Sequence, residues 1–166
     1  MKHAAYFLLF LSLVFASCED KDNTPSAEKE KISSKIRNGI ILKENMLKVE
    51  QAYLTYEDGS LVPSENKIDI NQKVLMRLVI DGWKEENGKV VIGASEKIST
   101  SENQVILDSK DLFETYPEGV DAKDAKLITL SAVITELDKL YDHFLVEFRV
   151  WDKKGGGAIS GSYKLY

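Results

Sequence analysis

The sequence predicts an all-β chain: a single antiparallel β-sandwich of seven or eight strands, Ig-like or transthyretin-like in arrangement. Three observations predict it. Apolar residues recur at every second position in several stretches, which is the period of a half-buried strand. The pairs Asp58-Gly59 and Asn87-Gly88 are typical of tight hairpin turns. With 166 residues, 43% of them hydrophobic, the chain can bury one core of ordinary size.

The first predicted strand covers residues 46–56. Side chains alternate between the two faces of a strand, so Leu47 falls on one face, whereas Ala52 and Leu54 fall on the other. We therefore expect a bulge, or a crossing between the two sheets, near Gln51.

The middle of the chain continues with strand patterns separated by turns. Short apolar pieces lie at residues 61–62 and 68–70, and a longer strand at 74–83 has apolar residues at alternate positions. The Asn-Gly pair at 87–88 predicts a hairpin, with residues 90–94 as the returning strand.

The last third of the chain predicts a short strand at 105–107, one helical turn within 108–116, and strands at 127–136, 144–150 and 159–165. Apolar and polar residues alternate in the strands at 127–136 and 144–150, as they do in antiparallel strands with one face in the core. These segments complete the seven or eight strands of the sandwich.

Residues 1–17 have the layout of a secretory signal peptide. Lys2 and His3 give a positive start, and the segment 4–16 is apolar apart from Ser12. As a helix this segment would reach about 20 Å, whereas the hydrocarbon core of a bilayer is about 30 Å thick. A transmembrane anchor is therefore disfavoured.

Cys18, the only cysteine, directly follows two small residues, Ala16 and Ser17. This arrangement resembles the lipobox of bacterial lipoproteins of the Bacteroidota type, with Phe15 where leucine is usual. The resemblance implies that Cys18 becomes the diacylated first residue and that the chain is anchored in the outer membrane, facing the periplasm or the cell surface. Two or more acyl chains make such an anchor stable. The alternative is an ordinary signal peptide with an incidental cysteine.

Residues 18–37 form a charged linker, and residues 38–166 form the domain. The acidic stretch at 19–23 resembles the signal that exports some lipoproteins of this group to the cell surface. Three isoleucines spaced by four predict a short amphipathic helix at the end of the linker. They are Ile32, Ile36 and Ile40.

The formal net charge is -5 and Lys and Arg form no cluster, so a nucleic-acid partner is excluded.

The mature chain offers few residues for catalysis or metal binding. His143 is its only histidine and has the outward strand parity, which indicates a surface residue rather than the base of a triad. Clustered Cys and His for zinc are absent from the sequence. The metal candidates are carboxylates that could bind calcium through oxygen. These are Asp108, Asp111, Glu118, Asp121 and Asp124. Their spacing matches no calcium loop, so we predict no metal and no cofactor.

The most informative aromatic residues are Trp83 and Trp151. Both have the outward parity of the charged residues in their predicted strands. An exposed indole provides broad contact area at small entropic cost, so Trp83 and Trp151 form the candidate binding surface. The alternative is that both rings close the edges of the sandwich core.

These observations predict a membrane-anchored lipoprotein that acts as a non-catalytic binding module in the cell envelope, with a protein or a glycan as its partner. One alternative is a structural lipoprotein subunit of an envelope or secretion machine, because small lipidated sandwiches resemble the outer-membrane lipoprotein of type VI secretion. The third is a hydrolase that uses paired carboxylates.

Overall fold

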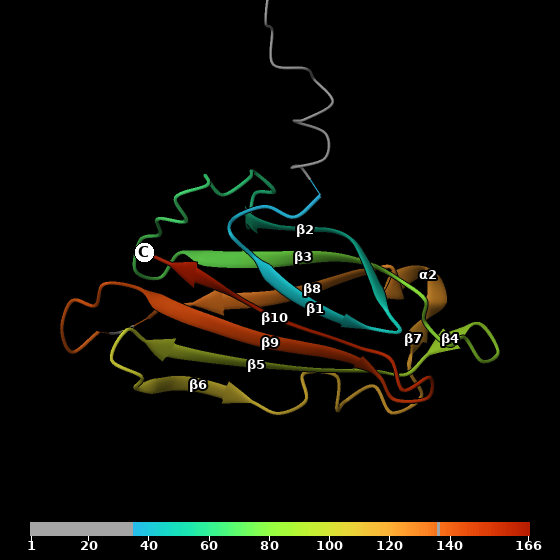
Figure 1. Cartoon of the computed structure of the whole chain (residues 1–166). Helices are drawn as coiled ribbons and strands as arrows, with labels where there is room; N and C mark the ends of the chain where they lie inside the picture. Colours follow the sequence, from blue (N-terminus) through green and yellow to red (C-terminus); the bar gives the residue numbers. More distant parts are fainter. Residues whose placement is uncertain (1–34, 136) are drawn as a thin grey trace, which may run out of the picture.

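The computed structural model describes residues 35–135 and 137–166 (Figure 1). The predicted signal peptide, the lipobox with Cys18 and all but the end of the linker lie outside these residues. Within the described part of the chain, no helix is long and apolar enough to cross a membrane. The elements are antiparallel strands in two main sheets, and the predicted all-β antiparallel sandwich is confirmed.

The larger sheet has five strands in the order β1-β10-β9-β5-β6. Their bounds are Ile41–Asn45 for β1, Ala158–Leu165 for β10, Phe144–Asp152 for β9, Ile92–Thr100 for β5 and Val105–Ser109 for β6. In Figure 1, β9, β5 and β6 run across the lower part of the molecule. The predicted strands at 105–107, 144–150 and 159–165 are all found in this sheet.

The smaller sheet has three strands in the order β2-β3-β8, and a two-stranded sheet joins β4 to β7. The bounds are Lys48–Tyr56 for β2, Lys73–Asp81 for β3, Leu127–Val133 for β8, Lys89–Val90 for β4 and Val120–Asp121 for β7. The four-residue helix α2, Ala122–Ala125, follows β7 directly. The sequence patterns did not predict this helix.

The core lies between the two main sheets and takes alternate side chains from each strand. In β8, for example, Ile128, Leu130 and Ala132 are buried while the residues between them are exposed. The largest completely enclosed side chains come from both sheets. They include Leu54, Met76 and Leu78 from the smaller sheet and Ile98, Ile159 and Leu165 from the larger. Each such side chain contributes roughly 1.5–3 kcal/mol when it is removed from water.

The predicted bulge near Gln51 is confirmed. The register between β2 and β3 shifts between Val49 and Gln51, so that one residue of β2 has no partner. The chain passes from one sheet to the other earlier, between Asn45 and Lys48. Met46 has a positive φ of 64° at this crossing, and Leu47 is completely buried.

The turn at Asn87-Gly88 is confirmed, but the hairpin predicted around it is wrong. Both residues have positive φ, 53° and 76°, as the tight turn requires. The turn closes only the bridge between Glu86 and Lys89. The strand directly after the turn, β4, pairs with β7, and β5 then pairs with β9 and β6 in the larger sheet, so neither strand returns to β3. A local turn signal cannot distinguish these two outcomes, because long-range pairing decides them.

Three further local predictions are wrong. Residues 35–40 contain no helix: Ile36 forms a parallel bridge with Ala52, and Ile40 is buried in the core. Residues 68–70 form no strand, although the Ile68 amide donates to the last carbonyl of the chain. Residues 112–115 form turns rather than helix.

A pair of buried asparagines joins three distant segments. Asn38 has a positive φ of 56°, and its Nδ2 donates to Asn66 Oδ1 at 2.9 Å and to Val62 O at 3.0 Å. Its Oδ1 accepts from the Leu54 amide at 3.0 Å. Asn66 Nδ2 donates in turn to the carbonyls of Asn38 and Lys164, both at 2.8 Å. The segment before β1, the loop after β2 and the last strand are thereby held together.

Candidate functional site

An open groove of about 420 Å³ lies along β9, β5 and β6 on the five-stranded sheet. This volume falls within the roughly 300–1,000 Å³ of small-molecule sites. The lining residues are Ser95, Glu96, Lys97, Asp108, Ser109, Lys110, Glu147, Phe148, Arg149 and Trp151. Six of these lining residues are charged, namely Glu96, Lys97, Asp108, Lys110, Glu147 and Arg149, so the groove is polar, with one indole at its end.

Trp151 lies on the outer face of β9, as its parity predicted. It faces Gly93 of β5 in the strand register. A Cβ atom built on Gly93 would lie 2.1 Å from Cε2 and 2.4 Å from Nε1 of the indole, so the ring occupies the space that a side chain at residue 93 would need. A glycine inside a strand marks such a close approach. The indole is thereby held against the sheet in a half-buried position.

Polar residues, three of them serines, flank Arg149 and Glu147 of β9. Arg149 is paired with Ser160 on one side and Ser95 on the other. Glu147 is paired with Ser162 and with Lys97 in the same way. Because directly paired residues present their side chains on one face of a sheet, the groove has hydroxyl groups next to charged groups and the indole.

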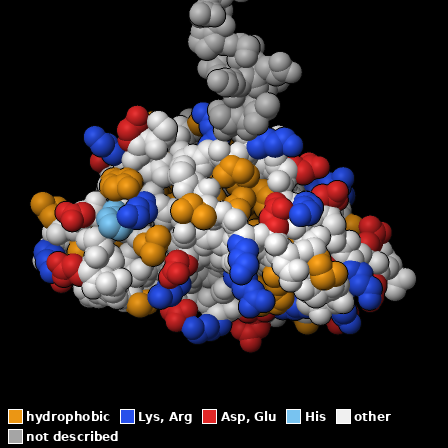
Figure 2. Space-filling model, viewed as in Figure 1, with side chains coloured by type: hydrophobic (Ala, Val, Ile, Leu, Met, Phe, Trp, Pro, Cys, Tyr) orange, Lys and Arg blue, Asp and Glu red, His pale blue; other side chains and the backbone are white. Residues whose placement is uncertain are grey.

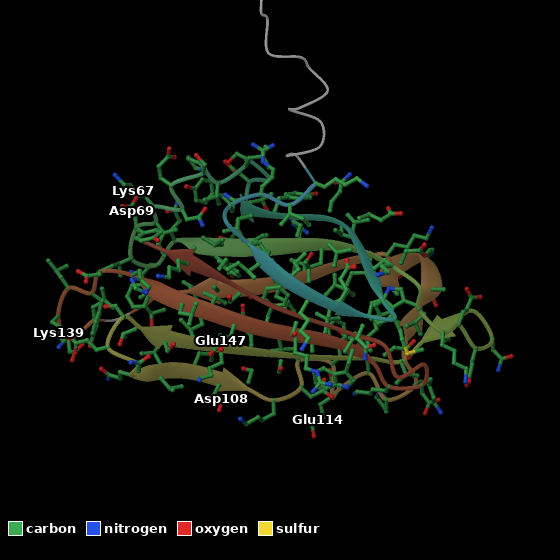
Figure 3. All side chains as sticks on the ribbon, viewed as in Figure 1. Lys67, Asp69, Asp108, Glu114, Lys139 and Glu147 are labelled. Atoms are coloured by element: carbon green, nitrogen blue, oxygen red, sulfur yellow. The ribbon has the colours of Figure 1, made fainter. Side chains whose placement is uncertain are left out.

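Ion pairs neutralise both carboxylates that have outward parity in the groove. Lys97 Nζ lies 3.3 Å from Glu147 Oε2, and Lys110 Nζ lies 2.6 Å from Asp108 Oδ2. Figure 3 labels Glu147 of β9 and Asp108 of β6 beside the strands that form the groove. The guanidinium carbon of Arg149 lies 5.5 Å from the centre of the Trp151 ring, within the range of a cation–π contact.

Trp83 does not belong to this surface, and its predicted outward register is wrong. β3 ends at Asp81, and Gly82 follows with a positive φ of 91°, so the alternation of the strand does not continue to residue 83. The Trp83 ring is half-buried against the core, and its Nε1 is buried without a hydrogen-bond partner among the described residues. Its position matches the alternative interpretation, a ring that closes the core.

The calcium candidates lie apart and have other partners. Asp121 of β7 forms an ion pair of 2.6 Å with Lys89, and Asp108 forms the pair with Lys110 described above. Asp111 Oδ1 accepts from the amides of Ala94 and Phe113, and its Oδ2 lies 2.6 Å from Lys153 Nζ. Burial raises the pKa of Asp111, but these hydrogen bonds together lower it below its usual value.

The remaining candidates, Glu118 and Asp124, also join no common site. Glu118 is exposed in the loop before β7, and Asp124 is exposed on α2. Within residues 35–135 and 137–166, no group of three His, Cys, Asp or Glu side chains is placed to hold a metal ion. His143 is half-buried with its ring 6.0 Å from that of Tyr166.

Two polar groups that the sequence analysis did not single out are buried beneath the groove. Glu96 of β5 is 2% exposed, and burial raises its pKa to about 7. Tyr163 of β10 is also buried, and burial followed by the charge of Glu96 raises its pKa well above the usual range. Glu96 Oε1 and the Tyr163 hydroxyl have no hydrogen-bond partner among the described residues. In the sequence, Glu96 falls on the same face of its strand as the apolar residues Ala94 and Ile98, and this pattern was the signal for its burial.

Comparisons with known proteins add little to the geometry. No protein-family model matches the sequence, and no curated protein matches it. Among solved structures, the chain is similar to the crystal structure of the C-terminal domain of wzt, with a TM-score of 0.49 and 11% sequence identity over 80% of each chain. This likeness is too distant to carry an argument about function. The fold and the groove therefore define only a structural class of protein. It is an antiparallel β-sandwich with an open polar groove and one indole on its larger sheet.

Proposed function

We propose that the chain is a lipid-anchored, non-catalytic binding module of the bacterial cell envelope, and that its groove binds a saccharide. The observation that carries the proposal is the position of Trp151, held over Gly93 at the end of a groove of charged and hydroxyl groups. A sugar ring has a face of C–H groups and a rim of hydroxyls. An indole packs against the face, and Ser, Arg and Glu side chains hydrogen-bond to the rim.

The membrane anchor is the part of the proposal that the sequence supports. A signal layout that ends at Ala16-Ser17-Cys18 favours a diacylated Cys18. The roughly twenty residues between Cys18 and the domain would span about 25 Å as a flexible chain. The groove would then stand clear of the lipid surface and face the periplasm or the outside of the cell.

The groove favours binding over catalysis. Glycoside cleavage needs a protonated carboxylic acid beside a second carboxylate. Glu147 and Asp108 are each paired with a lysine. Glu96 has a raised pKa, but its side chain is buried beneath the sheet and has inward parity, so it cannot reach a sugar in the groove.

The experiment is a glycan-array measurement with the full chain, extracted from membranes in detergent. We expect binding to at least one class of saccharide, and we expect Trp151→Ala to reduce the signal about tenfold or more, because a truncated anchor residue costs about 2 kcal/mol. Tyr53→Ala is the matched control, since Tyr53 is a half-buried aromatic residue of β2 in the other sheet. Equal signals for the Trp151 variant and the parent chain contradict the proposal.

The edge of the larger sheet favours a second candidate, a protein-binding subunit of an envelope machine. β6 is an edge strand, and its residues Val105, Ile106 and Leu107 are 50%, 41% and 38% exposed. An apolar edge strand can pair with an extended segment of another protein. Cross-linking in cells tests this candidate: Ile106→Lys should remove a cross-linked partner, whereas Thr129→Lys on β8 should retain it. A partner retained by both variants excludes the edge.

A further inference from the structure

We propose that the saccharide bound by the groove is acidic, and that Lys43 and Arg149 together hold its carboxylate or sulfate group beside Trp151. The inference rests on the proposed function, saccharide binding, and adds the chemical class of the ligand. It is carried by the strand register, by the absence of a carboxylate partner for either cation among the described residues, and by the position of Arg149 next to the indole.

The register places Lys43 and Arg149 on one row of the sheet. Lys43 of β1 is paired with Ser160 of β10, and Ser160 is paired with Arg149 of β9. The three side chains therefore leave the same face. Adjacent strands are about 4.8 Å apart, so the Cα atoms of the two cations are about 10 Å apart. Both long side chains can converge on a group bound over Ser160.

Neither cation is paired with a carboxylate in the described part of the chain, and the guanidinium of Arg149 lies over the Trp151 ring. Lys43 and Arg149 are both exposed, and neither forms an ion pair with any residue in 35–135 or 137–166. Lys97 and Lys110, the two lysines that line the groove, are paired with Glu147 and Asp108, and Lys43 lies beyond the lining on β1. Figure 2 shows Lys and Arg side chains gathered over the middle of this face, with Asp and Glu side chains nearby. The local charge left unpaired on this row is positive.

The chemistry of the row matches an oxygen anion on a sugar. The guanidinium of Arg149 presents a planar fork that binds two oxygens of a carboxylate or sulfate, and Lys43 adds a point charge. The Ser160 hydroxyl lies between them and can donate to the same group. Trp151 is the next outward residue after Arg149 along β9, so a sugar ring on the indole would place a ring substituent over Arg149.

The net charge of the chain does not oppose this binding at contact distance. The formal net charge is -5, but at physiological ionic strength charges more than about 8 Å away are largely screened. We therefore expect binding to depend on the two nearby cations and to weaken as salt is added, rather than to follow the charge of the whole molecule.

The test is calorimetric titration of the full chain in detergent with oligomers of galacturonic, glucuronic and mannuronic acid. Each is compared with its methyl ester, with the neutral oligomer of the same sugar, and with a sulfated neutral oligomer. We expect at least one acid or sulfate to bind about tenfold or more tightly than its uncharged counterpart, because hydrogen bonds to charged groups are stronger than neutral ones. Comparison of the carboxylated with the sulfated oligomers identifies the anionic group.

Three variants make the result specific. Lys43→Ala and Arg149→Ala should each remove most of the preference for the acid over the methyl ester. Arg149→Ala should also weaken binding of the methyl ester, because Arg149 lines the groove, whereas Lys43→Ala should change that affinity by less than about twofold. Trp151→Ala should weaken both forms. Lys164→Ala is the control, since Lys164 is an exposed lysine of β10 that is paired with Leu145 and so lies off the row of Ser160 and Arg149.

The failures of the two proposals are distinguishable. If acids and methyl esters bind equally, or if Arg149→Ala keeps the preference for the acid, the acidic class is overturned while saccharide binding stands. If no oligomer of the panel binds, both proposals are overturned.

Discussion

The indole of Trp151 occupies the space above Gly93, its partner across β9 and β5. Three atoms of the ring would lie 2.1–2.4 Å from a Cβ at residue 93, distances at which the ring must move. One glycine therefore determines where the only indole of the groove lies. The shape of the proposed binding surface at this end of the groove therefore depends on this pair.

Gly93→Ala should displace the Trp151 ring and lower the free energy of unfolding by about 1–3 kcal/mol, the usual cost of overpacking. Chemical denaturation measures this cost. In a Trp151→Ala background the same substitution should cost much less, because its steric conflict is gone. Ser95→Ala, at the next outward position of β5, is the control and should have little effect. Equal costs for Gly93→Ala in the two backgrounds would show that the conflict lies elsewhere.

Glu96 should make the domain less stable as the pH rises. Burial raises the pKa of Glu96 from 4.5 to about 7, so the folded chain binds this proton more tightly than the unfolded chain. The stabilisation is complete below about pH 4.5 and is lost as the pH rises through 7, a change of about 3 kcal/mol. Thermal unfolding between pH 5 and pH 8 measures it.

Glu96→Gln removes the titrating group and keeps the size of the side chain. This variant should lose most of the decline in stability and should be more stable than the parent chain at pH 8. Glu147→Gln, an exposed carboxyl on the neighbouring strand, should retain the decline. An unchanged pH profile in the Glu96 variant would mean that this carboxyl does not titrate in the folded chain.

Asn38→Ala should lower the free energy of unfolding by about 2–5 kcal/mol, since several buried donors and acceptors lose their partner at once. Asn71→Ala separates this effect from the cost of a positive φ. Asn71 has a φ of 67° but is exposed, so its replacement should cost about 1 kcal/mol or less. Urea denaturation of the two variants provides the comparison, and equal costs would rule out the buried network as the cause.

Cys18→Ala should release the chain from membranes, because the proposed acyl chains are attached to this sulfur. Cell fractionation followed by mass spectrometry of the mature N-terminus checks the result. Ser26→Ala in the linker is the control and should remain with the membranes. A Cys18 variant that still sediments with membranes, or an unmodified thiol in the parent chain, would contradict lipid anchoring.

The sequence predicted the class of fold because alternation is a local property. The alternating segments at 127–136 and 144–150 correspond to β8 and β9, and the bulge near Gln51 is present in β2. Pairing was not predictable in the same way. Residues 92–94 follow a true turn but join the larger sheet as part of β5, since contacts with β9, distant in the sequence, decide where β5 lies.

Of the two tryptophans that the sequence proposed for the candidate site, only Trp151 belongs to it. Parity alone placed Trp151 on the outer face, but it failed for Trp83, because the positive φ of Gly82 interrupts the strand before that residue. The sequence could not assign the serines and lysines beside β9 to the candidate site. Some come from strands 40 or more residues away in the sequence, and others, such as Ser160, come from the strand after the next turn. Gly93 did carry a readable signal, a glycine within a strand, which indicates a close approach by another group.

The most direct test of saccharide binding uses the two indole N–H signals of the full chain, one from Trp83 and one from Trp151. Two-dimensional NMR in detergent, with Trp151→Phe for assignment, follows both signals during titration with the panel of neutral and acidic oligomers. The proposal predicts that the Trp151 signal shifts in proportion to ligand bound while the buried Trp83 signal stays in place. A Trp151 signal that stays fixed with every oligomer, or a shift confined to Trp83, would contradict it.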